Sequence, residues 1–224
     1  MASLNGGAVY GKINRNSGPA ERLWIRVIRE PAADQTADGG TEGSVARMNV
    51  LPEIRIELRD AEWPLTYTDH DRQIVRAIVV DDAGSFYFVR AVRDDEFGAA
   101  TLIETSGGGV EPGEDLREAI RRELREELGA EVEILGKIGV VSDYYNLIHR
   151  HNINHYFLCR AKSFGSRHLT EDEMDKFHLS TLKLGYKDAA AEYERRACTP
   201  LGRLIANREL PILKRAREWM EGEL

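Results

Sequence analysis

The first half of the chain alternates apolar and polar residues in a way that predicts β-strands. Residues 54–58 alternate strictly, and β-rich runs at 74–80 and 85–92 flank the sequence Asp-Asp-Ala-Gly at 81–84, which is typical of a hairpin turn. Residues 93–99 are polar and predict a loop, and 101–105 predict the next strand.

The second half predicts two more strands and then helices. Residues 132–141 and 155–161 read as strands, 162–178 as a polar stretch, and 181–186 as a weaker strand. A short helix capped by Asp188 is expected at 188–196, another helical turn at 200–207, and an amphipathic closing helix at 211–220. Strands, one central helix, strands and then helices favour an α+β fold over a doubly wound sheet.

The N-terminal part has a different pattern. Residues 9–13 and 22–29 predict short strands, and the Ala-, Asp- and Gly-rich segment at 32–43 predicts a flexible linker. We therefore expect an N-terminal extension at 1–48 and a globular domain at 49–224 that includes the C-terminal helix.

Composition narrows the classes of function. The chain has 224 residues, 42% of them hydrophobic, which is enough for a sizeable core. Its net charge of −7 argues against a non-specific nucleic-acid surface. No apolar run has transmembrane length, and the two cysteines have no metal-ligand spacing. We expect a cytoplasmic protein without a membrane or nucleic-acid partner.

One stretch, 107–130, combines a glycine-rich turn with a helix that is rich in carboxylates. Glu123, Glu126 and Glu127 are spaced by three and four residues, so they share one side of the helix, next to its apolar stripe. Like charges within one turn repel, and a hard divalent cation would offset that repulsion. Oxygen ligands alone select Mg²⁺ or Mn²⁺. The alternative is that the glutamates form a solvated helix face neutralised by neighbouring arginines. That interpretation would be favoured if the glycine turn were absent.

The same stretch resembles the Nudix box, in which a glycine is followed after five residues by Glu and after seven more by Arg-Glu-apolar-x-Glu-Glu-x-Gly-apolar. The matching residues are Gly108, Glu114, Arg122, Glu123, Leu124, Glu126, Glu127 and Gly129. The closing apolar position holds Ala130, which is smaller than the usual residue there. The resemblance implies a Nudix-type α/β/α sandwich with a mixed sheet.

The resemblance also implies roles for individual residues. Glu126 and Glu127 would be the main Mg²⁺ or Mn²⁺ ligands, with Glu123 as a third ligand or an aid to water activation. The Gly107 carbonyl would be a backbone ligand, and Gly108 and Gly109 would approach the substrate. Arg122 would hold the glutamates in place by bidentate hydrogen bonds, and Glu114 would brace the loop or reach the metal through water.

Some family members take a further carboxylate, sometimes the general base, from a downstream loop. Glu173 is the first candidate here and Glu171 the second, ahead of Asp172 and Asp175, and a solvated acidic loop is the alternative.

The remaining candidates are residues that could contact the substrate. They are Arg90 and Arg93 for phosphate, Tyr144 and Tyr145 for stacking on a base, and His151 within a polar run at 149–155. The alternative for each is that it only packs in the core or lies on the surface.

The function that these residues predict is metal-dependent hydrolysis of a diphosphate in a nucleoside diphosphate linked to another group, such as ADP-ribose or a sugar nucleotide. The alternatives are a house-cleaning nucleoside triphosphate pyrophosphohydrolase and a non-catalytic Nudix nucleotide sensor. An isopentenyl diphosphate isomerase would be expected to show further cysteine and glutamate motifs that are not found. The N-terminal extension is compatible with a swapped arm in a homodimer or with a poorly ordered segment.

Overall fold

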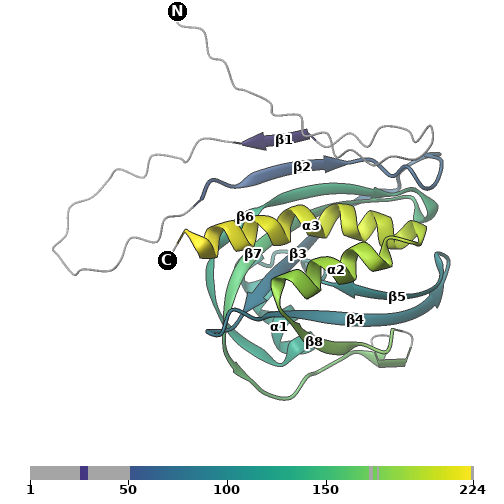
Figure 1. Ribbon diagram of the computed structural model, residues 1–224. Coiled ribbons are helices and arrows are strands. Elements are labelled where there is room, and N and C mark those ends of the chain that lie inside the picture. The colour runs from purple at the N-terminus through teal and green to yellow at the C-terminus, as the bar shows by residue number, and fades with distance from the viewer. Residues whose placement is uncertain (1–25, 30–50, 172–173, 176, 223–224) are drawn as a thin grey trace, which may run out of the picture.

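The computed structural model describes residues 26–29, 51–171, 174–175 and 177–222 (Figure 1). The helices are α1 (Leu116–Leu128), α2 (Tyr186–Arg196) and α3 (Pro200–Glu221), with a 3₁₀ turn η1 (Asn146–Ile148). The strands are β1 (Arg26–Arg29), β2 (Ile54–Leu58), β3 (His70–Val80), β4 (Phe86–Asp95), β5 (Gly98–Glu104), β6 (Ala130–Tyr145), β7 (Arg150–Phe164) and β8 (Ser180–Leu184).

These strands form one mixed sheet. Their order is β1-β2-β6-β7-β3-β4-β5, and β8 pairs with β4. The pairs β2–β6 and β3–β7 are parallel, whereas the other pairs are antiparallel. The hairpin of β3 and β4 pairs at only two positions, Val79 with Tyr87 and Val80 with Phe86. Beyond those pairs β4 leaves β3 and continues with β5, so the sheet opens at this point.

Helices cover both faces of the sheet. On one face, α1 contributes Ile120, Leu124 and Leu128 to a core shared with β3, β6 and β7. On the other face, α2 and α3 run side by side and bury Tyr193, Ile212 and other apolar residues against the sheet (Figure 1). This arrangement confirms the predicted α+β sandwich with a mixed sheet.

Two predicted loops are parts of strands. Residues 93–99 were expected to be a loop, but β4 runs to Asp95 and β5 starts at Gly98, because Asp95 and Gly98 pair across a tight turn. The polar run at 149–155 was also expected in a loop, yet from Arg150 onward it belongs to β7. That strand is central and hydrogen-bonds to β3 on one side and β6 on the other, which satisfies its backbone whatever its side chains are.

The C-terminal helices also differ from the prediction. Residues 200–221 form one helix, with Pro211 inside it, rather than two. Thr199 caps its start and Pro200 takes the first turn, where a missing N–H costs nothing. Leu204 and Ile205 before Pro211, and Ile212 and Leu213 after it, are all buried, so packing outweighs the proline penalty. Helix α2 starts after Gly185, and Asp188 lies in its first turn rather than at its cap.

The predicted strand at 22–29 is described from Arg26 to Arg29, where it pairs antiparallel with β2, whereas the one at 9–13 lies outside the described residues. No helix in the described ranges is long and apolar enough to cross a bilayer.

A buried ionic network joins α3 to the open side of the sheet. Arg208 is 1% exposed and contacts four groups on α3, β5 and β6: Glu209 at 3.0 Å, Asp143 at 3.2 Å, Glu104 at 3.3 Å and the Tyr145 hydroxyl at 2.8 Å. The Glu209 carboxylate also accepts hydrogen bonds from Thr105 and Tyr156. Removing the Arg208 guanidinium would leave these carboxylates in the protein interior without this ion-pair partner.

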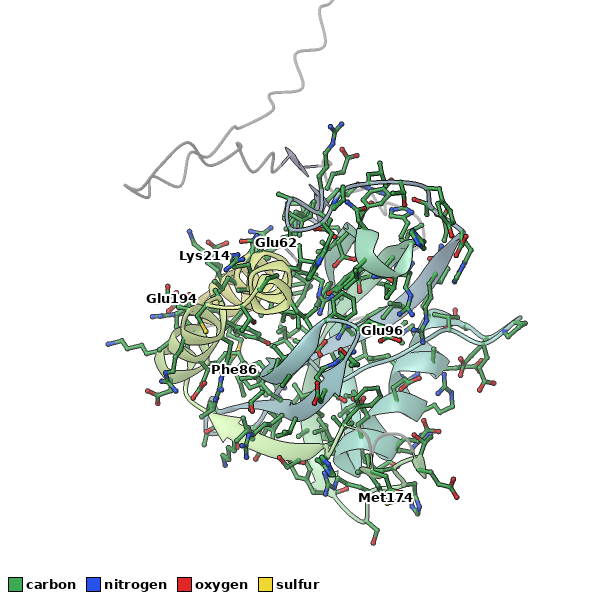
Figure 2. The ribbon with its side chains drawn as sticks, turned by 90° about the vertical axis from the view of Figure 1, so that its right-hand side faces the viewer. Glu62, Phe86, Glu96, Met174, Glu194 and Lys214 are labelled. Carbon is green, nitrogen blue, oxygen red and sulfur yellow. The ribbon has the colours of Figure 1, made fainter. Side chains whose placement is uncertain are left out.

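We therefore expect Arg208→Leu to lower the free energy of unfolding by about 3–5 kcal/mol. Lys214→Leu is the control, because Lys214 is exposed on the same helix and points into solvent (Figure 2). It should change stability by no more than about 0.5 kcal/mol. Urea unfolding measures both, and similar values for the two variants would show that the network does not stabilise the fold.

Candidate functional site

Helix α1 carries the three glutamates singled out by the sequence. The Asp115 carboxylate caps its first turn by accepting from the Arg117 N–H, and Gly129 ends it in the left-handed conformation, at φ 64°. Glu123 and Glu127 are each 7% exposed, and Glu126 is half-buried. The carboxylates are therefore beside the helix–sheet contact and not in bulk solvent.

The glycine loop at 107–109 lies against β3. The Val75 N–H donates to the Gly108 carbonyl at 2.9 Å, and the Ala77 N–H donates to the Ser106 carbonyl at 3.0 Å. Gly107, between these two positions, has φ 146°, and a Cβ there would come within 2.0 Å of the Val75 carbonyl oxygen. Only glycine fits this approach, and by alternation the Gly107 carbonyl turns away from β3.

The loop and the helix meet through two of the glutamates. Glu127 Oε2 accepts a hydrogen bond from the Ser106 hydroxyl at 2.6 Å and another from the Gly107 N–H at 2.9 Å. A Cβ at Gly108 would lie 2.5 Å from Glu123 Oε2, so this carboxylate packs directly on the loop backbone. The two glycines thus allow close approach on both sides of the loop.

Arg122 ties the loop to the helix. Its Nε and Nη2 bind the two oxygens of Glu114, each at 2.9 Å, and Nη2 also donates to the Gly109 carbonyl at 3.0 Å. Its Nη1 donates to Glu123 at 2.7 Å and to Glu126 at 3.3 Å. The hydrogen bonds with Glu114 and Glu123 raise the pKa of Arg122, and those from Arg122 lower the pKa of Glu114.

The chemistry of this donor set fits a hard divalent cation. Glu123, Glu126 and Glu127 offer carboxylate oxygens only, and Gly108 places no side chain between Glu123 and the loop. As they stand in the described part of the chain, no three acidic, histidine or cysteine side chains form a group that could hold an ion. An ion would therefore compete with the hydrogen bonds from Ser106 and Arg122.

The candidate downstream carboxylates lie in the segment before β8. Glu173 and Asp172 fall outside the described residues. Glu171 is exposed, and Asp175, also exposed, lines a cleft of about 1120 Å³ on the α3 side of the sheet. Asp175 is therefore the one of these carboxylates that the described structure places at a cleft.

The two predicted phosphate-binding arginines are in different places. Arg90 is exposed and lines a separate small cavity with Glu192 and Arg196 of α2. Arg93 lines the large cleft, but it is ion-paired with Asp95, and its guanidinium stacks on Phe97 and Phe177.

Tyr145 lies on one face of the sheet, whereas Tyr144 and His151 lie together on the other. Tyr145 is buried and lines the cleft, where its hydroxyl accepts from Arg208, and burial raises its pKa. His151 faces the opposite side of the sheet, because its neighbour Asn152 lines the cleft and strand residues alternate. There it hydrogen-bonds Asp71 and Ser142, each at 2.7 Å, and Tyr144 stacks on its ring at 4.4 Å.

Of the polar residues that β3 and β7 present to the cleft, Arg72 and Arg76 are not among the candidates from the sequence, whereas Arg150 and Asn152 belong to the polar run at 149–155 that is a candidate for substrate contact. The even spacing of these residues along each strand is a signal, since it puts them on one face. The signal is hidden locally, because 149–155 resembles a loop until β3 and β6 pair with it, and the apolar run of β3 starts only at Ile74, after Arg72.

The comparisons with known proteins centre on one family. The family model of the NUDIX domain matches residues 70–197, more than half of the chain. Over 29 residues the chain is 69% identical to the nucleoside triphosphatase NudI of an Enterobacter species, covering 13% of this chain and 21% of that one. Over 61 residues it is 43% identical to NudI of Escherichia coli, covering 27% and 42%. The chain thus spans less than half the length of the curated relatives that it matches.

A NUDIX hydrolase from Nitrosomonas europaea has a similar solved structure. The TM-score is 0.51 at 18% sequence identity, and the match covers 69% of this chain and 91% of that chain. At that identity the likeness shows the fold alone.

Two glycines of the loop region provide a matched test of the close approach to β3. Gly107→Ala should lower the free energy of unfolding by at least about 2 kcal/mol more than Gly113→Ala. Both positions have positive φ, at 146° and 83°, but a Cβ at Gly113 meets nothing within 4 Å. Thermal or urea unfolding compares the variants, and equal losses would mean that the loop does not need contact with β3.

Proposed function

This chain belongs to the Nudix family, and from that premise we propose that it hydrolyses a diphosphate linkage in a nucleotide with the help of a divalent cation. The observation that carries the proposal is the contact of Glu123 and Glu127 with the glycine loop. Arg122 adds a hydrogen bond to Glu123 there. Three carboxylates packed beside a loop of backbone amides and carbonyls are suited to a cation between protein and phosphate.

Glu126 and Glu127 would hold the cation, together with the Gly107 carbonyl and with Glu123 as a third ligand or an aid to water activation. When bound, Mg²⁺ or Mn²⁺ would polarise the phosphoryl oxygens and favour deprotonation of the attacking water. Arg122 would keep Glu123 and Glu126 in one orientation, because its planar guanidinium is fixed by both oxygens of Glu114.

The reaction itself is a hydrolysis. Water oxygen forms a new bond to one phosphorus, the bridging P–O bond breaks, and the two products each keep a phosphate, with the water protons passing to a base and to the leaving oxygen. Glu173 is the first proposed candidate for the base and Glu171 the second. The position of Asp175 in the wall of the cleft supports Asp175 as a further candidate.

We favour a nucleoside diphosphate linked to a further group, such as ADP-ribose or a sugar nucleotide. The cleft has a volume of about 1120 Å³, slightly above the range of roughly 300–1,000 Å³ that is usual for ligand pockets. It could therefore receive a nucleoside and part of a second moiety. A nucleoside triphosphate is the second candidate, because the relatives matched at 43% and 69% identity are nucleoside triphosphatases by name.

A panel of diphosphate compounds assayed with Mg²⁺ or Mn²⁺ distinguishes the substrates by their products. Cleavage of a sugar nucleotide gives a nucleoside monophosphate and a sugar phosphate, whereas cleavage of a triphosphate gives a monophosphate and pyrophosphate. Activity should disappear when the metal is chelated. Absence of turnover with every compound would instead favour a nucleotide sensor.

The glutamate variants test the ligand roles. Glu126→Gln and Glu127→Gln should each lose at least roughly 100-fold in kcat. Glu118→Gln, which removes an exposed carboxylate from the first turn of the same helix, should stay near wild type. In metal-free buffer Glu126→Gln should melt at the wild-type temperature or slightly above it, because one repulsive charge is removed. Near wild-type turnover in both site variants would contradict the proposed roles.

A further inference from the structure

Arg72 of β3 connects the large cleft with the glycine loop. It opens where β4 and β5 diverge from β3, and its other walls come from β7 and the start of α3, with Glu96 of the β4–β5 turn at its edge (Figure 2). Arg72 of β3 belongs to the cleft wall, yet its Nη2 lies 3.0 Å from the place that a Cβ on Gly109 would occupy. A ligand bound at Arg72 would therefore lie next to Gly109, at the edge of the proposed hydrolytic site.

Two arginines of the cleft form no ion pair with a carboxylate of the described residues. Of the five that line it, Arg76, Arg93 and Arg208 are each ion-paired with an acidic residue of β4, β5, β6 or α3. In the described part of the protein, neither Arg72 nor Arg150 makes an ion pair or a side-chain hydrogen bond. The positive charge of the cleft is thus concentrated where β3 and β7 begin, at the end nearer the glycine loop.

These two cations repel each other. Loss of surrounding water, then the charges of Arg150 and Arg76, lower the pKa of Arg72, whereas Glu123 raises it. An anion between Arg72 and Arg150 would relieve that repulsion. Guanidinium groups are suited to phosphate in particular, because their paired N–H donors match two of its oxygens.

Asn152 is an independent sign of a ligand in the same place. It pairs with Arg72 across the parallel β3–β7 ladder, so the two side chains emerge next to each other on the cleft face. Asn152 is 4% exposed, and its Oδ1 is buried with no hydrogen-bond partner in the described residues. Buried amide oxygens in folded proteins almost always have a donor, so this one is suited to a hydroxyl or N–H supplied by a ligand.

We propose that the cleft binds the nucleoside 5′-phosphate half of the substrate, with its phosphate between Arg72 and Arg150 and its nucleoside donating a hydrogen bond to Asn152. This assignment rests on the proposed function and deepens it, because it gives the substrate a direction. The nucleoside lies on the α3 side of the sheet, and the diphosphate passes Gly109 to reach the glutamates of α1.

Binding of two non-hydrolysable probes separates the two parts of the proposal. The probes are α,β-methylene-ADP and methylenediphosphonate, titrated calorimetrically in Mg²⁺ into the full chain. Arg72→Gln and Arg150→Gln should each raise the Kd of both probes about tenfold or more, because each removes a charge-assisted contact with phosphate. Arg72→Lys, which keeps the charge and loses the paired donors, should have a smaller effect.

Asn152→Ala should raise the Kd of α,β-methylene-ADP by about three- to tenfold and leave the Kd of methylenediphosphonate unchanged. Any fall in its melting temperature should come from lost side-chain packing alone, since Asn152 Oδ1 has no hydrogen-bond partner to lose among the described residues. Arg195→Gln is the matched control, because Arg195 is an exposed arginine on α2, paired only with Glu192 of its own helix in the described structure, and it should bind both probes like wild type.

The outcomes distinguish this inference from the proposed hydrolysis. If wild type hydrolyses a diphosphate but Arg72→Gln and Arg150→Gln bind both probes like Arg195→Gln, the phosphate assignment is wrong and the hydrolase assignment stands. If no compound is hydrolysed but the probes bind and their affinity depends on Arg72, the phosphate assignment stands and the hydrolase assignment is wrong. Failure of wild type to bind either probe at millimolar concentration overturns the inference, and equal weakening of both probes by Asn152→Ala overturns its nucleoside part.

Discussion

Arg122 connects the two halves of the candidate site, and the geometry of the glutamates depends on that connection. One guanidinium holds Glu114 and the Gly109 carbonyl on the loop side, and Glu123 and Glu126 on the helix side. Without the Arg122 guanidinium, three carboxylates within a single helical turn would repel one another and spread toward solvent. With it, their charge is partly balanced and their positions are fixed, so the repulsion that remains is available to favour a divalent cation.

The fold supports that site from both faces of the sheet. The α1 side supplies the glutamates and the glycine contacts, whereas the α3 side supplies a cleft whose floor is kept in place by the buried Arg208 network. Because β4 pairs with β3 at only two positions, the sheet opens beside the glycine loop and brings the two sides together. At this edge the backbone of the glycine loop pairs with β3 in place of β4, at Ile74 with Gly109 and at Ala77 with Ser106.

Much of this could be predicted from the sequence, for a physical reason. The glycine loop and α1 are neighbours in the sequence. The spacing of Gly108, Arg122 and Glu127 is therefore enough to predict the glycine turn and the helix face that carries the glutamates. The alternation at 54–58 likewise predicts β2. What local pattern could not give is long-range pairing: Arg150 and Asn152 look like loop residues until β3 and β6 provide hydrogen-bond partners on both sides. The single helix through Pro211 depends in the same way on burial that the sequence does not display.

The most direct test of the account is a crystal structure of the protein with Mn²⁺, located by its anomalous scattering. The account predicts an ion bound directly by carboxylate oxygens of Glu126 and Glu127, beside the Gly107 carbonyl, with the Ser106 or Arg122 hydrogen bonds rearranged to admit it. Mn²⁺ bound elsewhere, or no ordered ion while these hydrogen bonds persist at saturating metal, would contradict it.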